Sequence, residues 1–239
     1  SPDVLRVLCQ KLDPNIYEVK IFIGSTSHPS EKTKVFWEAF KDRISFIPEL
    51  KRRIYLWDAF LALVKLWRFF KDKKFDVVHT HTAKAGALGR VAAWLAGVRI
   101  IIHTPHGHNF YGYFDPFVSG MIIFIERMLT GITGKIMVLT ELEKNDYIKL
   151  GVAAERKLKL IHTGLELEEF RAEPKDFGLK ERFQIKADEL VIGFVGRLEP
   201  IKGPLYLAQA AKIVLEKKDN VRFVFVGEGS LREELQRDL

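Results

Sequence analysis

The sequence GRLEPIKG at residues 196–203 lies between an apolar run, 190–195, and a helix-patterned run, 204–216. This order predicts a strand, a glycine-bearing loop and a helix, the unit from which α/β sheets are built. Arg197 can grip two oxygens of an anion, Lys202 adds charge, and the first amides of the helix point at the same anion. The stretch fits a diphosphate site, and taken alone it fits a turn with two solvated cations equally well.

Length and composition describe a soluble globular chain. Its 239 residues, 47% hydrophobic and 29% charged, suffice for one large domain or two smaller ones. Cys9 is the single cysteine, which excludes an intrachain disulfide and fits a reducing compartment. The longest apolar run, 117–125, is about half a membrane span, and charged residues soon after Ser1 argue against a signal peptide.

Positive charge is concentrated between residues 41 and 74, which hold ten Lys or Arg against four acids in a chain of net charge +7. Lys51, Arg52 and Arg53 lie ahead of an aromatic-rich helix predicted at 55–71. Such a helix packs into a core and leaves its basic face in solvent, or it lies on an anionic membrane surface. Nucleic acid is not expected as a partner, because no binding motif accompanies the charge.

Predicted strands and helices alternate along most of the chain, which is typical of α/β proteins with parallel sheets. After a first helix from Ser1 to Leu12, strands are predicted at 17–23, 44–47, 76–79, 99–103, 135–139, 157–162, 190–195 and 221–226. Helices are predicted at 55–71, 83–97, 115–130, 141–150 and 204–216. An acid-rich segment after Gly164 breaks the pattern, so we place a domain boundary near Phe170.

Six of the seven histidines end or follow predicted strands: His79, His81, His103, His106, His108 and His162. Because ligands bind at the carboxyl edge of a parallel sheet, these positions predict a functional edge. His79, His103 and His162 suit structural roles at strand ends, whereas His106 and His108, on a glycine-bearing loop, suit ligand contact. A metal site is the alternative, but no Cys, Asp or Glu completes a familiar ligand set.

The helix predicted at 83–97 carries Gly86 and Gly89, whose spacing does not match a dinucleotide fingerprint. Their small size instead predicts close packing of this helix on the sheet. Lys84, near the helix start, meets an anionic acceptor or faces solvent. Neither a nucleophile elbow nor a carboxylate pair placed for glycoside hydrolysis is evident. The chemistry is therefore expected to rest on cations and histidines.

Four ordered motifs carry a family resemblance: DVVHTHTAKAG at 76–86, IHTPHGH at 102–108, IHTG at 161–164 and VGRLEPIKG at 195–203. With them the chain resembles family 4 glycosyltransferases, most of all bacterial members that build capsular polysaccharide, exopolysaccharide or lipid-linked glycans. The resemblance implies an α/β GT-B fold with two Rossmann-like domains. Residues 1–170 would be the acceptor-binding domain, and residues 171–239 the start of the nucleotide-sugar donor domain.

The resemblance also implies an enzyme that transfers a sugar, with retention of configuration, from a nucleotide-diphosphate donor, expected to be a UDP-sugar. Arg197 and Lys202 match the residues that bind the donor diphosphate, with Gly196 and Gly203 beside them. His106 matches the histidine that contacts the transferred sugar near the reaction centre. The resemblance implies no metal or other cofactor. In this family a donor phosphate oxygen, and not a side chain, takes the acceptor's proton, which accounts for the missing base.

The acceptor implied by the resemblance is a glycan or a lipid-linked glycan. Lys84, Gly107, His108 and Arg127 match less specific neighbours of that acceptor. A cytoplasmic location is expected, with peripheral attachment to the inner face of the plasma membrane. In the donor domain, Ser230 and Glu233 fit a capping box for the last helix.

Two features of the family do not fall within the chain. The first strand and its glycine-rich loop are expected ahead of Ser1, and the acidic motif that binds the donor's sugar and ribose is expected after Leu239. We therefore interpret the chain as a fragment lacking both ends and expect little transferase activity from it alone. A nucleotide-sugar 2-epimerase of the same fold and an inactive nucleotide-binding module are the alternative functions.

Overall fold

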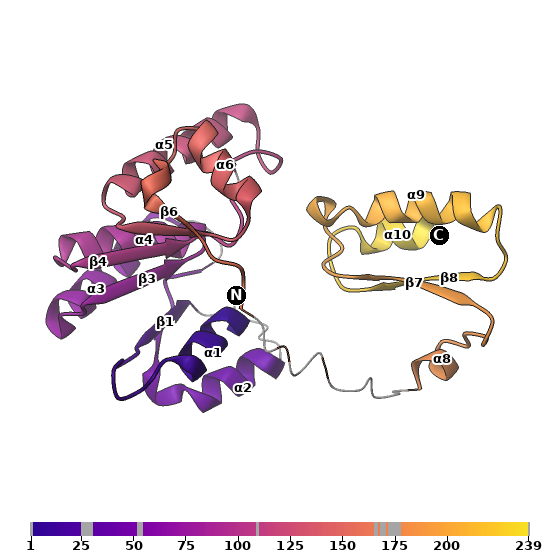
Figure 1. The fold of residues 1–239 in the computed structure, drawn as a ribbon, viewed down its shortest axis with the longest axis horizontal. Coiled ribbons are helices and arrows are strands. Elements are labelled where there is room, and N and C mark those ends of the chain that lie inside the picture. Colours follow the sequence, from indigo (N-terminus) through magenta and orange to yellow (C-terminus); the bar gives the residue numbers. More distant parts are fainter. Residues whose placement is uncertain are drawn as a thin grey trace. The chain divides into compact units, whose positions relative to one another are not determined.

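The structure is a computed structural model, and it describes residues 2–24, 31–51, 55–108, 110–164, 167, 171 and 178–238. The chain divides into two units, unit 1 (Ser1–Phe170) and unit 2 (Arg171–Leu239), both drawn in Figure 1. Phe170, near which the sequence places a domain boundary, lies outside the described residues.

Unit 1 contains a parallel sheet of four strands in the order β3-β4-β5-β6. These strands are β3 (Val77–His81), β4 (Ile100–Thr104), β5 (Lys135–Val138) and β6 (Leu158–Leu160). The crossovers between them carry α4 (Ala83–Leu95), α5 (Pro116–Gly131) and α6 (Glu141–Lys149). The alternation predicted from the sequence is confirmed, because each helix returns the chain to the edge from which the next parallel strand starts.

A separate two-stranded parallel sheet in unit 1 pairs β1 (Ile21–Gly24) with β2 (Ile44–Ile47). The helices in this part of the chain are α1 (Pro2–Lys11), α2 (Glu31–Ala39) and α3 (Leu56–Lys73). Helix α2 was not predicted from the sequence. Its buried anchor is Phe36, which packs in a small cluster with Cys9 and Ile21.

The strand predicted from Tyr17 begins only at Ile21, so this prediction was wrong at its start. The carboxylate of Asp13 accepts a hydrogen bond from the Asn15 amide at 2.9 Å, and its carbonyl accepts one from the Tyr17 amide at 2.9 Å. These bonds hold residues 13–17 in a turn. An aspartate side chain that bonds a nearby backbone amide competes with extended structure in this way.

The core of unit 1 lies between the four-stranded sheet and helices α3 to α6. In the parallel register His103 stands opposite Ile136, so both side chains point to the same face of the sheet. They are 1% and 0% exposed, respectively. Burial of apolar area on this face, at about 25 cal/mol per Å², supplies the main stabilisation of the unit.

Two glycines let α4 approach the sheet more closely than other residues would. A Cβ atom on Gly86 would lie 2.4 Å from Cε1 of His103, and one on Gly89 would lie 2.8 Å from Cγ2 of Thr80. Real Cβ atoms do not approach other atoms so closely. The close packing predicted from the sequence for this helix is therefore confirmed.

A buried ion pair joins α4 to α5. The guanidinium of Arg90, 0% exposed, donates to both carboxylate oxygens of Glu126 at 2.8 and 3.0 Å and to the Gly86 carbonyl at 3.1 Å. Removal of one partner from such a pair leaves a buried charge uncompensated and costs about 3–5 kcal/mol. The sequence analysis did not identify this pair, because the two residues lie far apart along the chain.

Unit 2 pairs β7 (Leu190–Val195) with β8 (Val221–Val226) in parallel, at the predicted bounds. Helices α9 (Pro204–Leu215) and α10 (Arg232–Asp238) lie on one side of this pair (Figure 1). Their core includes Leu198, Ala208 and Leu235. Short elements complete the described chain: α8 (Leu179–Arg182) and the 3₁₀ helices η1 (Lys41–Arg43), η2 (Glu155–Lys157) and η3 (Pro200–Lys202).

Gly86→Ala and Gly120→Ala form a matched test of the close packing of α4. Inside a helix, alanine is favoured over glycine by about 1 kcal/mol. A Cβ atom at Gly120 has nothing within 4 Å, unlike the one at Gly86. We expect Gly86→Ala to lower the free energy of unfolding by about 1–3 kcal/mol and Gly120→Ala to raise it. Urea titration followed by circular dichroism measures both, and equal effects would contradict the close contact.

Candidate functional site

The carboxyl ends of β3 and β4 bring several histidines to one edge of the sheet. His79 and His81 end β3, His103 lies near the end of β4, and a loop carrying His106 and His108 follows. The register pairs His81 with Thr104, so the two strand ends lie at the same level. We refer to the carboxyl ends of β3 and β4 with the 105–108 loop as the histidine edge.

His81 and His106 are joined through their rings. Nδ1 of His81 lies 2.9 Å from Nε2 of His106, and the rings stack with centroids 5.1 Å apart. His106 has φ of 59° and Gly107 has φ of 92°, so two successive residues adopt the left-handed region. A residue with a side chain pays about 1–3 kcal/mol for such a conformation, which is often found at functional loops.

The other strand-end histidines have partners within the sheet. Nε2 of His79 lies 2.8 Å from the Thr104 hydroxyl, and Nδ1 of His103 lies 2.9 Å from the Thr80 hydroxyl. Nδ1 of His162 donates to the Leu139 carbonyl at 3.0 Å. These contacts agree with the structural roles that the sequence analysis expected for the three histidines.

His108 is held by α6 rather than by the strands. Its Nε2 lies 2.9 Å from a carboxylate oxygen of Asp146, which also accepts a hydrogen bond from the Tyr111 hydroxyl at 2.5 Å. Its ring stacks on Phe110, with centroids 4.6 Å apart. Burial opposes ionisation of Asp146, but the hydrogen bonds from Tyr111 and His108 outweigh it and lower the pKa of this carboxyl. The sequence analysis missed Asp146 and Tyr111.

The structure separates the two basic residues predicted near the acceptor. Lys84, at the start of α4, donates from Nζ to the Lys51 carbonyl at 2.8 Å and lies at the histidine edge. Arg127 donates to the carbonyl of Leu150, the C-cap of α6, at 2.5 Å. Because α6 runs back from the carboxyl edge, its C-terminal end lies at the opposite edge of the sheet. The structure does not bring Arg127 to the histidines.

Burial keeps His79, His81 and His103 neutral at neutral pH. It lowers the pKa of His79 to about 4, of His81 to about 3 and of His103 to about 2, and nearby positive groups lower them further. Burial also lowers the pKa of His106. Neutral imidazoles both donate and accept hydrogen bonds, so they are suited to hydroxyl groups. Among the described residues, no three His, Cys, Asp or Glu side chains are grouped to hold a metal ion.

A cavity of about 880 Å³ lies beside the histidine edge within unit 1. Its lining is mostly apolar and comes from α1, β1, α2, α3 and β3, while His79, His81 and Thr82 add polar groups. In the part of the chain that the structure describes, β1 pairs only with β2 and β3 only with β4, so one edge of each lies open beside this cavity. Its volume lies within the range of small-molecule sites.

In unit 2, the loop at 196–203 is held in place by its neighbours. The Gly196 amide donates to the Val226 carbonyl at 3.0 Å, and Leu198 is 5% exposed. The Glu199 carboxylate accepts hydrogen bonds from the amide and the hydroxyl of Ser230 at 3.3 and 2.8 Å. The Ser230 hydroxyl is thereby directed to Glu199, and α10 begins at Arg232. The predicted capping box was wrong, because the loop before α10 bonds to the loop after β7.

Two glycines allow the loops after β7 and β8 to touch. A Cβ atom on Gly227 would lie 1.8 Å from the Gly196 carbonyl oxygen, and one on Gly229 would lie 2.3 Å from the Leu198 carbonyl oxygen. No side chain fits at either position. The GEG sequence at 227–229 therefore holds the 196–203 loop at the carboxyl edge of unit 2.

Arg197 and Lys202 are exposed on this loop, and neither forms an ion pair with another described residue. Gly203, with φ of 66°, is the N-cap of α9, and Pro204 lies in the first turn. Two available cations beside a helix N-terminus form an arrangement that binds phosphate oxygens. The predicted residues thus fall into two groups: Lys84, His106, Gly107 and His108 in unit 1, and Gly196, Arg197, Lys202 and Gly203 in unit 2.

Comparison with known proteins gives matches to both units. Residues 3–169 match the family described as Glycosyltransferase Family 4, and residues 178–238 match Glycosyl transferases group 1. A UDP-Gal:alpha-D-GlcNAc-diphosphoundecaprenol alpha-1,3-galactosyltransferase of Escherichia coli is 37% identical over 81% of this chain and 51% of its own length. The Staphylococcus aureus capsular polysaccharide biosynthesis glycosyltransferase CapM is 27% identical over 79% and 50%. The chain spans about half the length of these curated relatives.

Solved structures show the same fold. HepE of Anabaena, in complex with UDP and glucose, has a TM-score of 0.73 at 16% identity and covers 99% of this chain and 60% of its own. UDP-GlcNAc 2-epimerase of Neisseria meningitidis, bound to UDP-GlcNAc, has a TM-score of 0.63 at 16% identity, covering 100% and 64%. The predicted GT-B fold is confirmed. The fold by itself does not separate a transferase from an epimerase.

Acid is expected to destabilise unit 1 through its buried histidines. An unfolded histidine titrates near pH 6.5, whereas the folded pKa values of His79, His81 and His103 are about 4, 3 and 2. Between these values the unfolded chain binds more protons, so the free energy of unfolding falls as the pH drops below about 6.5, by about 1.4 kcal/mol per unit for each histidine. Urea unfolding at several pH values measures the slope.

His103→Asn and His79→Gln are each expected to remove about one proton from that slope. Both substitutions keep a hydrogen-bonding group for the threonine partner while they remove the titrating ring. A slope that is equal in the wild-type chain and in both variants would contradict the assignment to these histidines.

Proposed function

The chain belongs to glycosyltransferase family 4, and on this premise we propose that it is part of an enzyme that transfers a sugar from a nucleotide-diphosphate donor. The transfer retains the anomeric configuration, as the family resemblance implies. The product belongs to cell-envelope polysaccharide or lipid-linked glycan synthesis, in line with the printed names of the E. coli and S. aureus relatives.

The observation that carries this proposal is the exposed cation pair on the 196–203 loop. Arg197 and Lys202 lie beside the N-terminus of α9, on a backbone held by Gly227 and Gly229. During transfer the bond from the sugar to the diphosphate breaks, and negative charge grows on the leaving phosphate. Cations that are already in place stabilise this charge without reorganisation, and they accelerate the reaction because the charge is larger in the transition state.

The histidine edge supplies hydrogen bonds for the sugar rather than positive charge for the diphosphate. His106, neutral and hydrogen-bonded to His81, serves the transferred sugar, whose groups are hydroxyls. Lys84, Gly107 and His108 lie near the acceptor in this proposal. Arg127 has no part in it, because its guanidinium is bound to the C-terminal end of α6. The reaction needs no metal in this proposal, because Arg197 and Lys202 neutralise the diphosphate. A donor phosphate oxygen receives the acceptor's proton, so no side-chain base is needed.

UDP is the proposed nucleotide of the donor, and a lipid-linked glycan is the preferred acceptor. The name of the E. coli relative includes both UDP-galactose and a diphosphoundecaprenol acceptor. HepE, which shares the fold, binds UDP and glucose, and this supports the choice of UDP. An epimerase reaction is the second candidate, because a UDP-GlcNAc 2-epimerase shares the fold. Incubation of the complete protein with UDP-GlcNAc and no acceptor separates the two, since only an epimerase forms an epimer.

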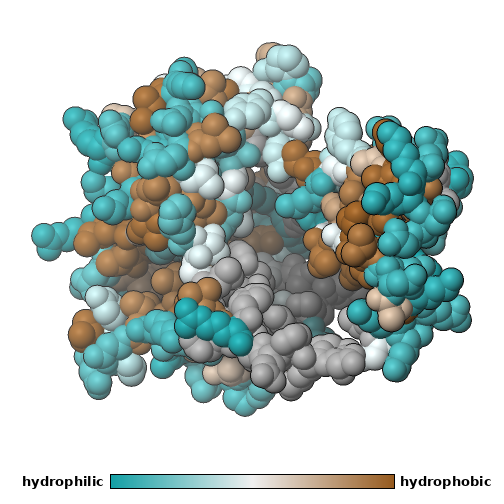
Figure 2. Space-filling model, turned by 45° about the vertical axis from the view of Figure 1, so that its right-hand side comes forward, coloured by the Kyte–Doolittle hydropathy of each residue, from teal (hydrophilic) through white to brown (hydrophobic). Residues whose placement is uncertain are grey.

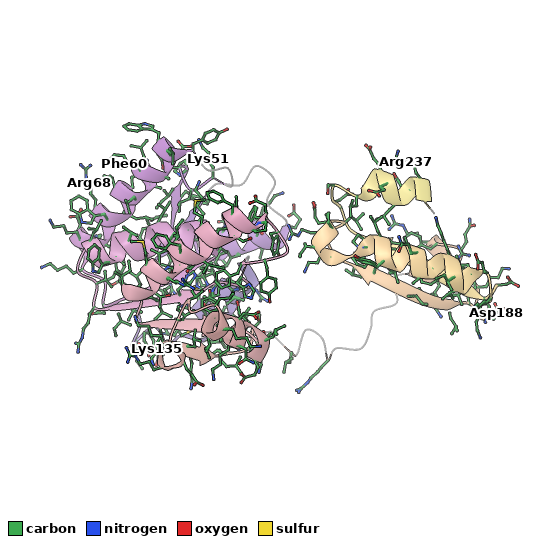
Figure 3. The ribbon with its side chains drawn as sticks, turned by 90° about the horizontal axis from the view of Figure 1, so that it is seen from above. Lys51, Phe60, Arg68, Lys135, Asp188 and Arg237 are labelled. Carbon is green, nitrogen blue, oxygen red and sulfur yellow. The ribbon has the colours of Figure 1, made fainter. Side chains whose placement is uncertain are left out.

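Contact with an anionic membrane surface is also proposed. At the start of α3, Leu56, Trp57 and Phe60 are 86%, 69% and 53% exposed. Phe60 and Arg68, both on this helix, lie with Lys51 along one side of unit 1 (Figure 3). Apolar residues come to the surface among polar ones in Figure 2. No helix in the described residues combines the length and the apolar character needed to cross a bilayer.

The segment that leads to α3 lies on the functional side of the unit, because the Lys51 carbonyl accepts a hydrogen bond from Lys84, at the start of α4, at 2.8 Å. A second apolar stripe is exposed on α5, at Phe117, Met121, Phe124 and Met128. Aromatic and apolar side chains next to cations are typical of helices that bind the bilayer interface. This placement would bring a lipid-linked acceptor to the histidine edge. Arg52 and Arg53, part of the predicted basic cluster, lie outside the described residues.

The diphosphate role predicts a large effect of Arg197→Ala in the complete protein that contains this chain. We expect kcat/KM to fall about 10²–10³-fold and UDP binding to weaken, with the thermal unfolding midpoint unchanged because Arg197 is exposed. Lys212→Ala, an exposed lysine on α9, is the control and should change neither. Full transfer by the Arg197→Ala variant would contradict the diphosphate role. If the wild-type protein transfers no sugar and Arg197→Ala only abolishes UDP binding, the inactive nucleotide-binding module is favoured. Addition of EDTA should leave the transfer rate of the wild-type protein unchanged.

The membrane proposal predicts that the chain sediments with vesicles rich in phosphatidylglycerol and not with pure phosphatidylcholine vesicles. Trp57→Ser with Phe60→Ser should reduce the bound fraction about tenfold or more, and so should neutralisation of Lys51, Arg52 and Arg53. Ile213→Ser is the matched control, because Ile213 is 57% exposed on unit 2 and Phe60 is 53% exposed. Unchanged vesicle binding by both groups of variants would contradict the proposal that this surface contacts the membrane.

A further inference from the structure

His81 is a residue whose position is set by the sheet. It is the last residue of β3 and stands opposite Thr104 of β4. The amide of Thr82 donates to the Thr104 carbonyl at 3.2 Å, so backbone pairing continues past His81. The ring of His79 lies against that of His81, with centroids 4.2 Å apart. Both the backbone and the ring of His81 are therefore held in place.

His106 has no such support from a strand. It lies in the loop after β4 with φ of 59°, and Gly107 follows with φ of 92°. Among the described residues, its side chain has one hydrogen bond, from Nε2 to Nδ1 of His81 at 2.9 Å. Nδ1 of His106 makes none within that part of the chain. The orientation of the His106 ring thus depends on His81.

The same bond couples the protonation of the two rings. A neutral imidazole carries one N–H, and its other nitrogen is an acceptor. One proton lies between Nδ1 of His81 and Nε2 of His106. If His81 donates it, the proton of His106 sits on Nδ1, which is then a donor. If His106 donates it, Nδ1 of His106 is an acceptor. The tautomers of the two rings are therefore coupled, and neither changes without the other.

We propose that His81 is a positioning residue, which holds the ring of His106 in one orientation and one tautomer so that Nδ1 of His106 meets a sugar hydroxyl with a single polarity. The proposal rests on the proposed function, in which His106 contacts the transferred sugar. It gives the second histidine of the HTH sequence at 79–81 a role that the family resemblance did not assign. His81 itself does not touch the sugar in this arrangement.

A fixed polarity at His106 has a consequence for specificity. A site that is built to hydrogen-bond one hydroxyl rejects a sugar without it, because the protein group is then left unpaired. A His106 ring that exchanged between tautomers would present a donor for part of the time and an acceptor for the rest. His81 removes this exchange, as hydrogen-bonded carboxylates do for histidines that bind metals.

The test is nuclear magnetic resonance of the 239-residue chain, in which the chemical shifts of the ring nitrogens report which nitrogen is protonated. The wild-type chain should show a single tautomer at His106. His81→Leu, which offers no hydrogen bond, should give a mixture. His81→Asn, whose side-chain amide can occupy the place of Nδ1, should restore a single tautomer. His162→Gln, which removes a ring bonded to the Leu139 carbonyl rather than to these histidines, should leave the His106 shifts unchanged.

Two outcomes overturn the proposal. The first is a mixture of tautomers at His106 in the wild-type chain, which needs no variant and holds even if His81→Leu fails to fold. The second is a set of His106 shifts that is the same in the wild-type chain and in a folded His81→Leu variant. Resonances of α4 and α5 around the Arg90–Glu126 pair, which lie in the same unit as His81, serve as the check that each variant is folded.

Transfer kinetics of the complete protein distinguish this proposal from the function on which it rests. His81→Leu should lower kcat/KM about tenfold or more with UDP binding unchanged, and His81→Asn should recover most of the loss. If the wild-type protein transfers no sugar but the shifts behave as expected, the proposed function fails and the coupling of the two histidines stands. If it transfers sugar and His81→Leu changes neither shifts nor rate, this proposal alone fails.

Discussion

The close approach of α4 to the sheet is the constraint on which unit 1 depends. Gly86 and Gly89 lie where a Cβ atom would overlap His103 and Thr80, so no larger residue lets the helix reach its position. That position places Lys84, at the start of the helix, beside the carboxyl edge. It also buries the ring of His103 to 1% exposure, which is why this histidine is neutral and structural.

The candidate residues of unit 1 and those of unit 2 differ in charge. His79, His81 and His103 of unit 1 are neutral because burial disfavours imidazolium. The loop of unit 2 presents the basic side chains of Arg197 and Lys202 in solvent. A nucleotide sugar has the same two kinds of group, hydroxyls on the sugar and charge on the diphosphate. The match between protein groups and donor groups is the physical basis of the proposed sugar transfer.

Periodicity in the sequence predicted most of the fold. The strands at 190–195 and 221–226 have the predicted bounds, because continuous apolar runs between turn residues leave little choice. Helix α2 was missed, and the first strand was started too early, because short elements and local turns such as that of Asp13 leave a weak pattern. The pair of Arg90 with Glu126 had no signal at all, since charge alone does not distinguish a buried arginine from an exposed one.

The sequence by itself determined the α/β class, the order of the elements, the likeness to family 4 glycosyltransferases and the kinds of residue that follow each strand. Only the tertiary structure decided which of them meet: His81 with His106, Glu199 with Ser230, and Arg127 with the far end of α6. The physical reason is that secondary structure follows from neighbours along the chain, whereas these contacts join residues more than twenty positions apart. Strand register and helix packing bring such residues together, and neither can be predicted from a short stretch of the sequence.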